Sequence, residues 1–248
     1  MKAPFDLTGK VFIVTGSGKG IGKGIVRCFV KAGAKCTINC NSNRAMAEET
    51  LKEIQAIGGE DCAFLYQADV SDYAQAEAMA KATYDHFGRI DGLVNNAALQ
   101  KQWMLDEYPI KDYDLLMHVN LGGYINMMRA VLPYLKETRG SITCISSVHG
   151  KRPTDFDPVY AMTKGGMHML LREAAIEFAK YGVRVNMIMP AGVKIEFKTG
   201  NPRPFQKPRL TPPREYYEKY PMYPLGRHGL PEDFSGACLR ADGCSMLL

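Results

Sequence analysis

The stretch VFIVTGSGKGIG, residues 11–22, decides the fold. Its first six residues form an apolar, β-branched run that ends in glycine, which is typical of a buried strand. Apolar residues then recur at helical spacing over residues 21–31. Gly16, Gly20 and Gly22 therefore fall between a strand and a helix, where glycine permits a tight turn and lets the backbone approach a pyrophosphate. We predict a βαβ unit that binds a dinucleotide.

Strand and helix patterns alternate strictly along the rest of the chain. Strands are expected at 36–40, 62–70, 93–98, 141–147 and 183–189, and helices at 44–57, 71–87, 113–135 and 159–181, with Ser71 or Asp72 as the cap of the second of these helices. Such alternation is typical of a parallel sheet covered by helices on both faces. Right-handed crossovers then predict an α/β, doubly wound, Rossmann-like sheet. Because no linker divides the chain, we expect one domain over residues 1–248.

Composition excludes several classes of protein. The sequence has no run of about 18 apolar residues and begins without an apolar leader, so we expect a cytoplasmic protein without a membrane span. The net charge of +5 is modest, and residues 194–227 alone supply it (8 Lys and Arg minus 3 Asp and Glu), which argues against a nucleic-acid binder. The seven cysteines are scattered without a CxxC pair, so no disulfide framework and no metal site are expected.

The residues after the second strand bear on the choice of cofactor. An acid about 20 residues beyond the glycine loop usually holds a free ribose 2′-hydroxyl. Residues 39–44 contain no carboxylate. Lys19 lies inside the glycine loop, and Arg44 is placed to face it; both suit a 2′-phosphate. The sequence therefore favours NADP(H), with NAD(H) as the alternative.

Several further motifs follow in order: Asp69-Val70, NNAA at 95–98, Asn120 in HVNLGG, and the set Ser147, Tyr160 and Lys164. With TGSGKGIG, they make the chain resemble the short-chain dehydrogenase/reductase family in its compact form, over residues 6–192 and again over 224–237. The resemblance implies an oxidoreductase that transfers a hydride between a nicotinamide and a carbonyl or secondary alcohol. It also implies self-association as a dimer or tetramer.

The glycine pattern and the resemblance together give the expected cofactor contacts. By similarity, Asp69 and Val70 flank the adenine, Asn96 and Ala97 line the adenosine side, and Val193 contacts the nicotinamide carboxamide. The full expected set is Gly16, Ser17, Lys19, Gly20, Ile21, Gly22, Asn41, Arg44, Asp69, Val70, Asn96, Ala97, Tyr160, Lys164 and Val193.

The catalytic chemistry can be argued from spacing. Tyr160 and Lys164 share one helix face. Lowering a tyrosine pKa of about 10 by about 3 units requires about 4 kcal/mol, which one cation at about 4 Å supplies at an effective dielectric of about 20. Lys164 is therefore expected to tune Tyr160 as proton donor or acceptor. Ser147 would hydrogen-bond the substrate oxygen, and by resemblance Asn120 holds a water that relays protons.

The substrate is expected to be polar. Ser147, His149 and Tyr160 are the predicted substrate contacts, and Lys151, Arg152, Asp155 and Asp157 lie in the same stretch. This favours a sugar, polyol or sugar acid; a 3-oxoacyl thioester is the alternative within the same chemistry. A catalytically impaired dinucleotide-binding scaffold or sensor is the alternative of another class. The family's substrate lid corresponds to residues 194–223, which are basic and rich in proline, so they either attract an acidic substrate or form a solvated loop.

The chain departs from the family pattern at several places. Ala98 and Ala191 replace glycine, and Ile195 replaces a threonine that normally helps to hold the cofactor. After Pro231 the family continues through a helix into a seventh strand, whereas this chain ends in ACLRADGCSMLL at 237–248. We therefore expect the seventh strand to be missing, with impaired stability or altered assembly.

Overall fold

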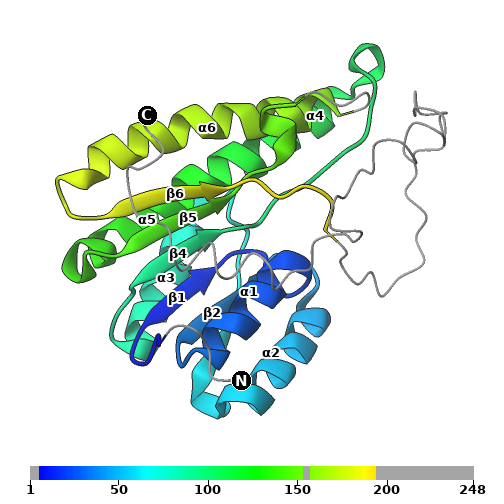
Figure 1. Ribbon diagram of the computed structural model, residues 1–248. Coiled ribbons are helices and arrows are strands. Elements are labelled where there is room, and N and C mark those ends of the chain that lie inside the picture. Colours follow the sequence, from blue (N-terminus) through cyan, green and yellow to red (C-terminus); the bar gives the residue numbers. More distant parts are fainter. Residues whose placement is uncertain (1–5, 153–156, 194–248) are drawn as a thin grey trace, which may run out of the picture.

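The computed structural model describes residues 6–152 and 157–193. In this part of the chain, six parallel strands form one sheet in the order β3-β2-β1-β4-β5-β6 (Figure 1). The strands are β1 (Val11–Val14), β2 (Lys35–Cys40), β3 (Ala63–Gln67), β4 (Gly92–Asn95), β5 (Ser141–Ile145) and β6 (Arg184–Ile188). This order confirms the doubly wound, Rossmann-like fold. The predicted lid and the missing seventh strand lie outside the described residues.

Helices cover both faces of the sheet, as predicted. The helices are α1 (Gly20–Lys31), α2 (Arg44–Gly58), α3 (Tyr73–Phe87), α4 (Ile110–Met117), α5 (Gly123–Thr138) and α6 (Pro158–Ala179). Helices α1 and α2 pack on one face through Phe29 and Ile54. Helices α3, α5 and α6 pack on the other through Met79, Met127 and Leu171. Figure 1 shows α1 and α2 next to each other, apart from α5 and α6.

Side-chain caps explain where two of the helices begin. Asp72 is the cap of α3, and its Oδ1 accepts hydrogen bonds from the backbone N–H groups of Ala74 at 2.9 Å and Gln75 at 3.2 Å. Of the two candidates in the sequence, Asp72 rather than Ser71 caps this helix. Asn43 caps α2 by accepting a hydrogen bond from the backbone N–H of Met46 at 3.1 Å. Such caps satisfy backbone donors that have no partner inside the helix.

The helix expected at 113–135 is interrupted. A π-helical segment, η3 (His118–Gly122), separates α4 from α5. A single π turn inserted into an α-helix is frequent at functional sites. Here the segment contains Asn120, whose side chain is fully buried. Hydrophobic spacing does not reveal this change, because the apolar pattern continues through it.

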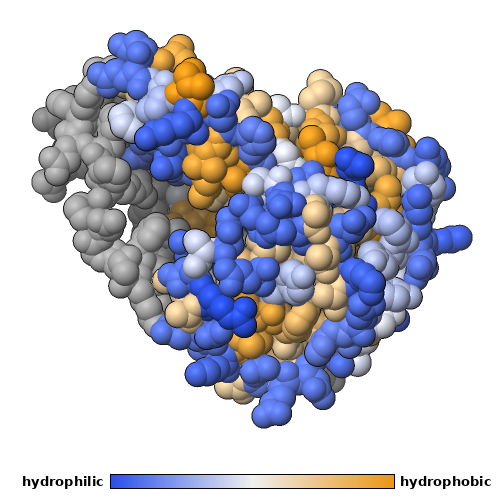
Figure 2. Space-filling view, turned by 180° about the vertical axis from the view of Figure 1, so that it is seen from behind, coloured by the Kyte–Doolittle hydropathy of each residue, from blue (hydrophilic) through white to orange (hydrophobic). Residues whose placement is uncertain are grey.

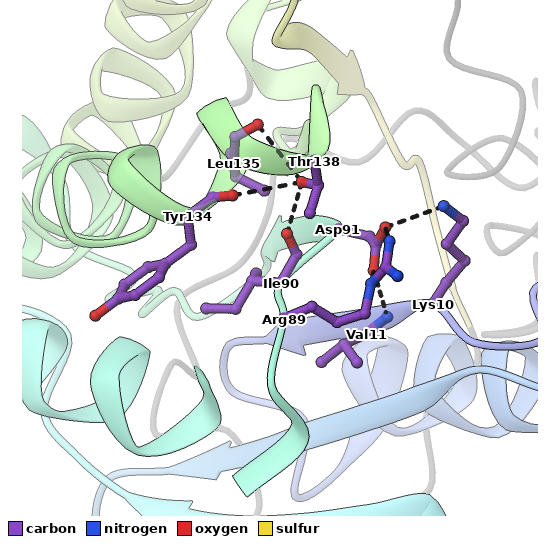
Figure 3. A network of polar contacts seen from close by, with 8 residues as sticks. All are labelled: Lys10, Val11, Arg89, Ile90, Asp91, Tyr134, Leu135 and Thr138. Carbon is purple, nitrogen blue, oxygen red and sulfur yellow. Dashed lines mark hydrogen bonds and ion pairs between the residues drawn. The ribbon is translucent and has the colours of Figure 1, made fainter. Parts of the chain in front are cut away.

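A polar network holds the edge of the sheet at which the strands begin (Figure 3). The buried carboxylate of Asp91 accepts a hydrogen bond from the N–H of Val11 at 3.0 Å, and it binds the Nζ of Lys10 at 3.1 Å. Arg89 donates to both oxygens of this carboxylate, at 2.8 and 2.7 Å. Nearby, the hydroxyl of Thr138 donates to the carbonyl oxygen of Ile90 at 2.8 Å. Asp91 thus ties the start of β1 to the loop before β4.

The surface seen from behind is mixed in character. Figure 2 shows hydrophilic residues over most of this face, with hydrophobic ones between them. Among the helices that the structure describes, none combines the length and the apolar character needed to cross a membrane.

Candidate active site

The glycine loop between β1 and α1 is held by side chains from neighbouring strands. Gly16 has φ +61° and Gly20 has φ +58°, a region that favours glycine. The N–H of Gly16 donates to the Oδ1 of Asn39 at 3.0 Å. The hydroxyl of Thr15 accepts hydrogen bonds from the backbone N–H groups of Asn96 at 2.9 Å and of the following residue at 3.0 Å. These hydrogen bonds therefore fix the conformation of the glycine loop without a ligand.

Glycine is also required where the loop meets its neighbours. A Cβ on Gly16 would lie 2.9 Å from the Cα of Ala97, and one on Gly22 would lie 2.6 Å from the amide nitrogen of Asn96. Asn96 Nδ2 itself donates to the carbonyl oxygens of Thr15 at 2.8 Å and Gly16 at 3.2 Å. Asn96 and Ala97 therefore lie beside the loop and support its shape, and their contact with the adenosine stays a prediction.

The N-terminus of α1 fits an anion. Its cap residue, Lys19, is exposed and makes no side-chain hydrogen bond to the first turn, and that turn contains no acidic residue. The free backbone N–H groups and the helix dipole favour negative charge at such a position. The described residues of this loop thus fit the pyrophosphate of a dinucleotide.

Two asparagines, Asn39 and Asn41, occupy the end of β2, where an acid that binds the ribose 2′-hydroxyl would be expected. Asn39 is buried, and its Nδ2 donates to the carbonyl oxygen of Ala68 at 3.1 Å, so this side chain is used inside the fold. The exposed Asn41 donates from Nδ2 to Asp69 Oδ2 at 3.0 Å. Asp69 also accepts from the hydroxyl and the N–H of Ser71, at 2.6 and 2.9 Å. Asn41 and Asp69 therefore lie together at the carboxyl ends of β2 and β3.

Val70 and Val193, two predicted cofactor contacts, differ in how deeply their side chains are buried. The side chain of Val70 is buried in the core, where it lies against Gly123. A Cβ on Gly123 would lie 2.7 Å from Val70 Cγ2, so the glycine is needed for this contact. Val193 is half-buried and is the last described residue, five positions after the end of β6.

The two predicted cations are both exposed, and Lys19 lines a small hollow beside α2. Arg44 lies outside this lining; it begins α2 and forms a 2.8 Å ion pair with Glu48. An exposed pair of this kind contributes little stability, so its cation can exchange partners. The hollow is lined by Gly18, Lys19, Lys23, Met46, Glu49, Thr50 and Glu53.

Asn120 connects the loop after β4 to α6. Its Oδ1 accepts the N–H of Leu99 at 2.8 Å, and its Nδ2 donates to the carbonyl oxygen of the same residue at 2.9 Å. Nδ2 also donates to the hydroxyl of Thr163 at 3.2 Å, and that hydroxyl donates to the carbonyl oxygen of Tyr160 at 2.8 Å. Sequence reasoning named Asn120 but found neither partner, because both contacts join residues that are distant in the chain.

Tyr160 and Lys164 lie one turn apart on α6, as their spacing predicted. The Nζ of Lys164 lies 5.5 Å from the centre of the Tyr160 ring and donates to the carbonyl oxygen of Ile145 at 2.8 Å. Lys164 is 1% exposed, and burial lowers its pKa to about 7. This hydrogen bond therefore joins α6 to the end of β5.

The pKa of Tyr160 differs from the expected direction. Burial raises it to about 12, a hydrogen bond with Ser147 lowers it in part, and the charge of Asp157 raises it further. The lowered pKa that the spacing predicted for Tyr160 is therefore wrong for this structure, because burial dominates, and Tyr160 is protonated over the physiological range.

Ser147 and His149 complete the group around Tyr160. Ser147 follows β5, is nearly buried, and accepts the N–H of His149 at 3.2 Å. The imidazole ring of His149 meets the Tyr160 ring edge-on, with 5.8 Å between the centres. Burial lowers the pKa of His149, so the ring is neutral at physiological pH. Ser147, His149, Tyr160 and Lys164 are thus gathered at the carboxyl end of β5.

Two hydrogen-bonded pairs lie beside this group; of their members, only Asp157 was named from the sequence, as part of the polar stretch near Ser147. The hydroxyl of Ser146 and the Nε2 of His168 are hydrogen-bonded at 2.9 Å, and both residues are buried. Gln100 donates a hydrogen bond to the Oδ2 of Asp157, directly before α6. The sequence held one signal for the second pair, since Asp157 precedes Pro158 at a helix start.

Comparisons with known proteins identify the family of this chain. The family model described as short chain dehydrogenase matches residues 10–203. Glucose 1-dehydrogenase 2 of Bacillus subtilis (strain 168) is 32% identical over 235 residues, which are 94% of this chain and 87% of the relative. L-rhamnose 1-dehydrogenase (NAD(P)(+)) of Sphingomonas sp. (strain SKA58) is 30% identical over 232 residues, with 93% and 87% coverage.

A third relative has a different kind of substrate in its name. 3beta-hydroxysteroid dehydrogenase 1 of Eggerthella lenta is 33% identical over 234 residues, which are 94% of this chain and 86% of the relative. The fold, the glycine loop and the matches over most of the chain lead to one conclusion: this protein belongs to the short-chain dehydrogenase/reductase family of NAD(P)-dependent oxidoreductases.

Proposed function

We propose that this oxidoreductase uses NADP(H) and acts on the carbonyl or secondary alcohol of a sugar, polyol or sugar acid. The observation that supports it best is the convergence of Ser147, His149 and Lys164 on Tyr160 at the carboxyl end of β5. In doubly wound sheets, ligands bind at the carboxyl ends of the strands. When bound, the nicotinamide supplies or accepts the hydride.

The side chains take the following roles in this proposal. Tyr160, which is protonated at physiological pH, donates its proton to the carbonyl oxygen during reduction. Ser147 hydrogen-bonds the same oxygen and stabilises its developing negative charge. In its charged form, Lys164 stabilises the phenolate that Tyr160 leaves behind. Asn120 fixes the loop after β4 against α6, and by family resemblance it also holds a water that relays protons.

The preference for NADP(H) rests on charge at the end of β2. Neutral Asn41 stands where an acid would repel a 2′-phosphate, and it is bonded to Asp69 at 3.0 Å. The exposed cations Lys19 and Arg44 are available to a phosphate near the glycine loop. Arginine and lysine bound to phosphate form strong, charge-assisted hydrogen bonds.

The polar substrate class rests on the groups that surround Tyr160. Gln100, His149 and Asp157 all lie near it, and none offers an apolar wall to a sterol ring. Two relatives are named for sugars, glucose and rhamnose, although a third is named for a steroid. A polar wall fits hydroxyl-rich substrates best, because buried polar groups need hydrogen-bond partners.

Self-association as a dimer or tetramer is also part of the proposal. Met162, Met169 and Ile176 are exposed at seven-residue intervals on α6, so they form an apolar stripe on one side of this helix. Light scattering after size exclusion would give the mass in solution. A monomer at micromolar concentration would contradict this part.

The direct test is a screen of carbonyl and alcohol substrates with both cofactors, followed by the absorbance of reduced nicotinamide. The panel would pair aldoses, polyols and sugar acids with a 3-oxoacyl thioester and a 3-hydroxysteroid. We expect the hydroxylated substrates with NADP(H) to give the highest kcat/KM. A higher value for the thioester or the steroid would reject the substrate class, and tight cofactor binding without any turnover would favour a scaffold or sensor.

A further inference from the structure

Asp157 occupies the cap position of the catalytic helix without capping it. An aspartate there normally accepts a hydrogen bond from the N–H two or three residues later, which stabilises a helix by about 1 kcal/mol. In α6 that donor is the N–H of Tyr160, and no side-chain cap bond forms. The N–H of Tyr160 still lowers the pKa of the carboxyl group, but it does so less than Gln100 does. The stronger partner of this carboxylate therefore lies outside its own helix.

Gln100 is the group that orients it. Its Nε2 donates to the Oδ2 of Asp157, so the loop after β4 is joined to the start of α6. The other oxygen, Oδ1, is buried and has no hydrogen-bond partner among the described residues. Asp157 is 0% exposed. A buried carboxylate oxygen without a partner is costly, so each such atom in a native protein needs an explanation.

The surroundings of Asp157 belong to the active site. Burial is the main reason that the pKa values of Tyr160 and Tyr108 are raised, and the charge of Asp157 raises both further. The Nδ1 of His149, whose ring contacts Tyr160, is the second buried side-chain atom without a partner in this part of the chain. Both atoms without partners thus belong to neighbours of the proposed proton donor, which indicates a ligand with several hydroxyl groups.

We propose that Asp157, oriented by Gln100, determines specificity by accepting a hydrogen bond from a second hydroxyl of the substrate, next to the carbon that exchanges the hydride. This inference rests on the proposed function, and it adds the position at which the substrate must carry a second hydroxyl group. An ionised carboxylate only accepts hydrogen bonds, so it selects for a donor. Burial raises the pKa of Asp157 to about 6, with Gln100 lowering it in part, so the acceptor form prevails at neutral pH.

The test compares two probes that differ by one hydroxyl, cyclohexane-1,2-diol and cyclohexanol, oxidised with NADP+. A site built to bind a hydroxyl discriminates against the analogue that lacks it. We expect the wild type to prefer the diol by about 10- to 100-fold in kcat/KM, the range for a hydrogen bond to a charged group. Asp157→Leu should abolish this preference, because it should lower kcat/KM for the diol far more than kcat/KM for cyclohexanol.

Three further variants complete the design. Asp157→Asn keeps an acceptor oxygen and should retain part of the preference for the diol. If Asp157→Leu fails to fold, Asp157→Asn tests the role of the carboxylate in its place. Gln100→Leu should reduce the preference because Asp157 loses its orienting donor. Asp114→Leu, at an exposed carboxylate on α4, is the matched control and should leave the preference unchanged.

The outcomes separate this inference from the proposed reaction. An unchanged preference in Asp157→Leu and Asp157→Asn, or an equal loss for both probes, would overturn the role of Asp157 and leave the reaction standing. If the wild type oxidises neither probe, binding of the diol to the enzyme with NADP+ is measured by calorimetry. Weaker binding in Asp157→Leu would then support the subsite although the reaction fails, and equal binding would overturn it.

Discussion

The Nζ of Lys164 donates a 2.8 Å hydrogen bond to the carbonyl oxygen of Ile145, the last residue of β5. This bond ties α6 to the strand that precedes Ser147, and the lysine lies 5.5 Å from the centre of the Tyr160 ring. The contact between α6 and the sheet therefore helps to hold the proposed proton donor next to its proposed cation.

Tyr160→Phe should remove the proton donor without disturbing the cofactor site. We expect kcat/KM to fall by about 10²- to 10⁴-fold, the usual contribution of a positioned acid or base. The dissociation constant of NADPH, measured by fluorescence, should change by less than about threefold, because the glycine loop is untouched. Activity near the wild-type level would refute the assignment.

The value of kcat/KM for reduction of the carbonyl substrate should fall as the pH rises through about 7. Burial lowers the pKa of Lys164 to about 7, so the stabilising cation is present below this pH and is lost above it. The proton of Tyr160 remains in place, because its pKa is raised to about 12. The logarithm of kcat/KM for reduction should therefore fall above pH 7 in the wild type. Lys164→Met should be slow at every pH and lack this decline; the same decline in the variant would exclude Lys164 as its source.

Lys19→Ala and Arg44→Ala should each weaken NADPH binding. Loss of one exposed cation that faces a phosphate costs about 1 kcal/mol, or about fivefold in KM for NADPH, with little effect on NADH. Lys52→Ala, an exposed lysine further along α2, is the control and should change neither value. Equal losses for both cofactors, or a wild type that prefers NADH, would reject the NADP(H) proposal.

Asn120→Ala should lower the free energy of unfolding. The N–H and the carbonyl oxygen of Leu99 would both lose their partner, which costs about 1–3 kcal/mol for each buried group left without a hydrogen bond. Urea unfolding would measure the loss. Asn126→Ala is the comparison, since its amide joins only the carbonyl oxygens of Val70 and Ser71. We expect a smaller loss there, and an equal one would argue against a special role for the two-sided contact.

Asp91→Asn should reduce stability at neutral pH and weaken its dependence on acid. Burial acts to raise the pKa of Asp91, but hydrogen bonds from Arg89, Val11 and Lys10 outweigh it and hold the pKa below its ordinary value. The stabilisation is therefore complete above a pH of about 4 and is lost as the pH falls through the folded-state pKa. We expect a loss of about 2–4 kcal/mol at pH 7, measured by urea unfolding.

The test is the difference in the free energy of unfolding between the wild type and Asp91→Asn, measured at several pH values. It should shrink as the pH falls from about 4 toward the lower folded-state pKa, because the carboxylate of the unfolded chain is protonated first. A difference that stays constant with pH would show that Asp91 acts through packing rather than through its charge. Figure 3 shows why a charge effect is expected, since the carboxylate lies between Lys10 and Arg89.

The sequence alone determined the order and type of the elements, and it proposed the catalytic set that the structure brings together at the end of β5. Alternating apolar patterns predicted the parallel sheet, because a strand buried on both faces and an amphipathic helix each leave a local signature. Glycine spacing after β1 predicted the cofactor loop for the same reason, since φ near +60° at Gly16 and Gly20 is a local requirement. The helical spacing of Tyr160 and Lys164 needed no knowledge of the rest of the chain.

Only the tertiary structure decided how these side chains are partnered and charged. The bonds of Asn120 to Leu99 and of Asp157 to Gln100 join segments 21 and 57 residues apart, which no local pattern encodes. Burial raises the pKa of Tyr160 and lowers that of Lys164, so it favours the neutral form of each side chain. This effect outweighs the attraction between opposite charges that their spacing suggested. Sequence periodicity records which face a residue occupies, whereas burial and long-range contacts decide what that residue can do there.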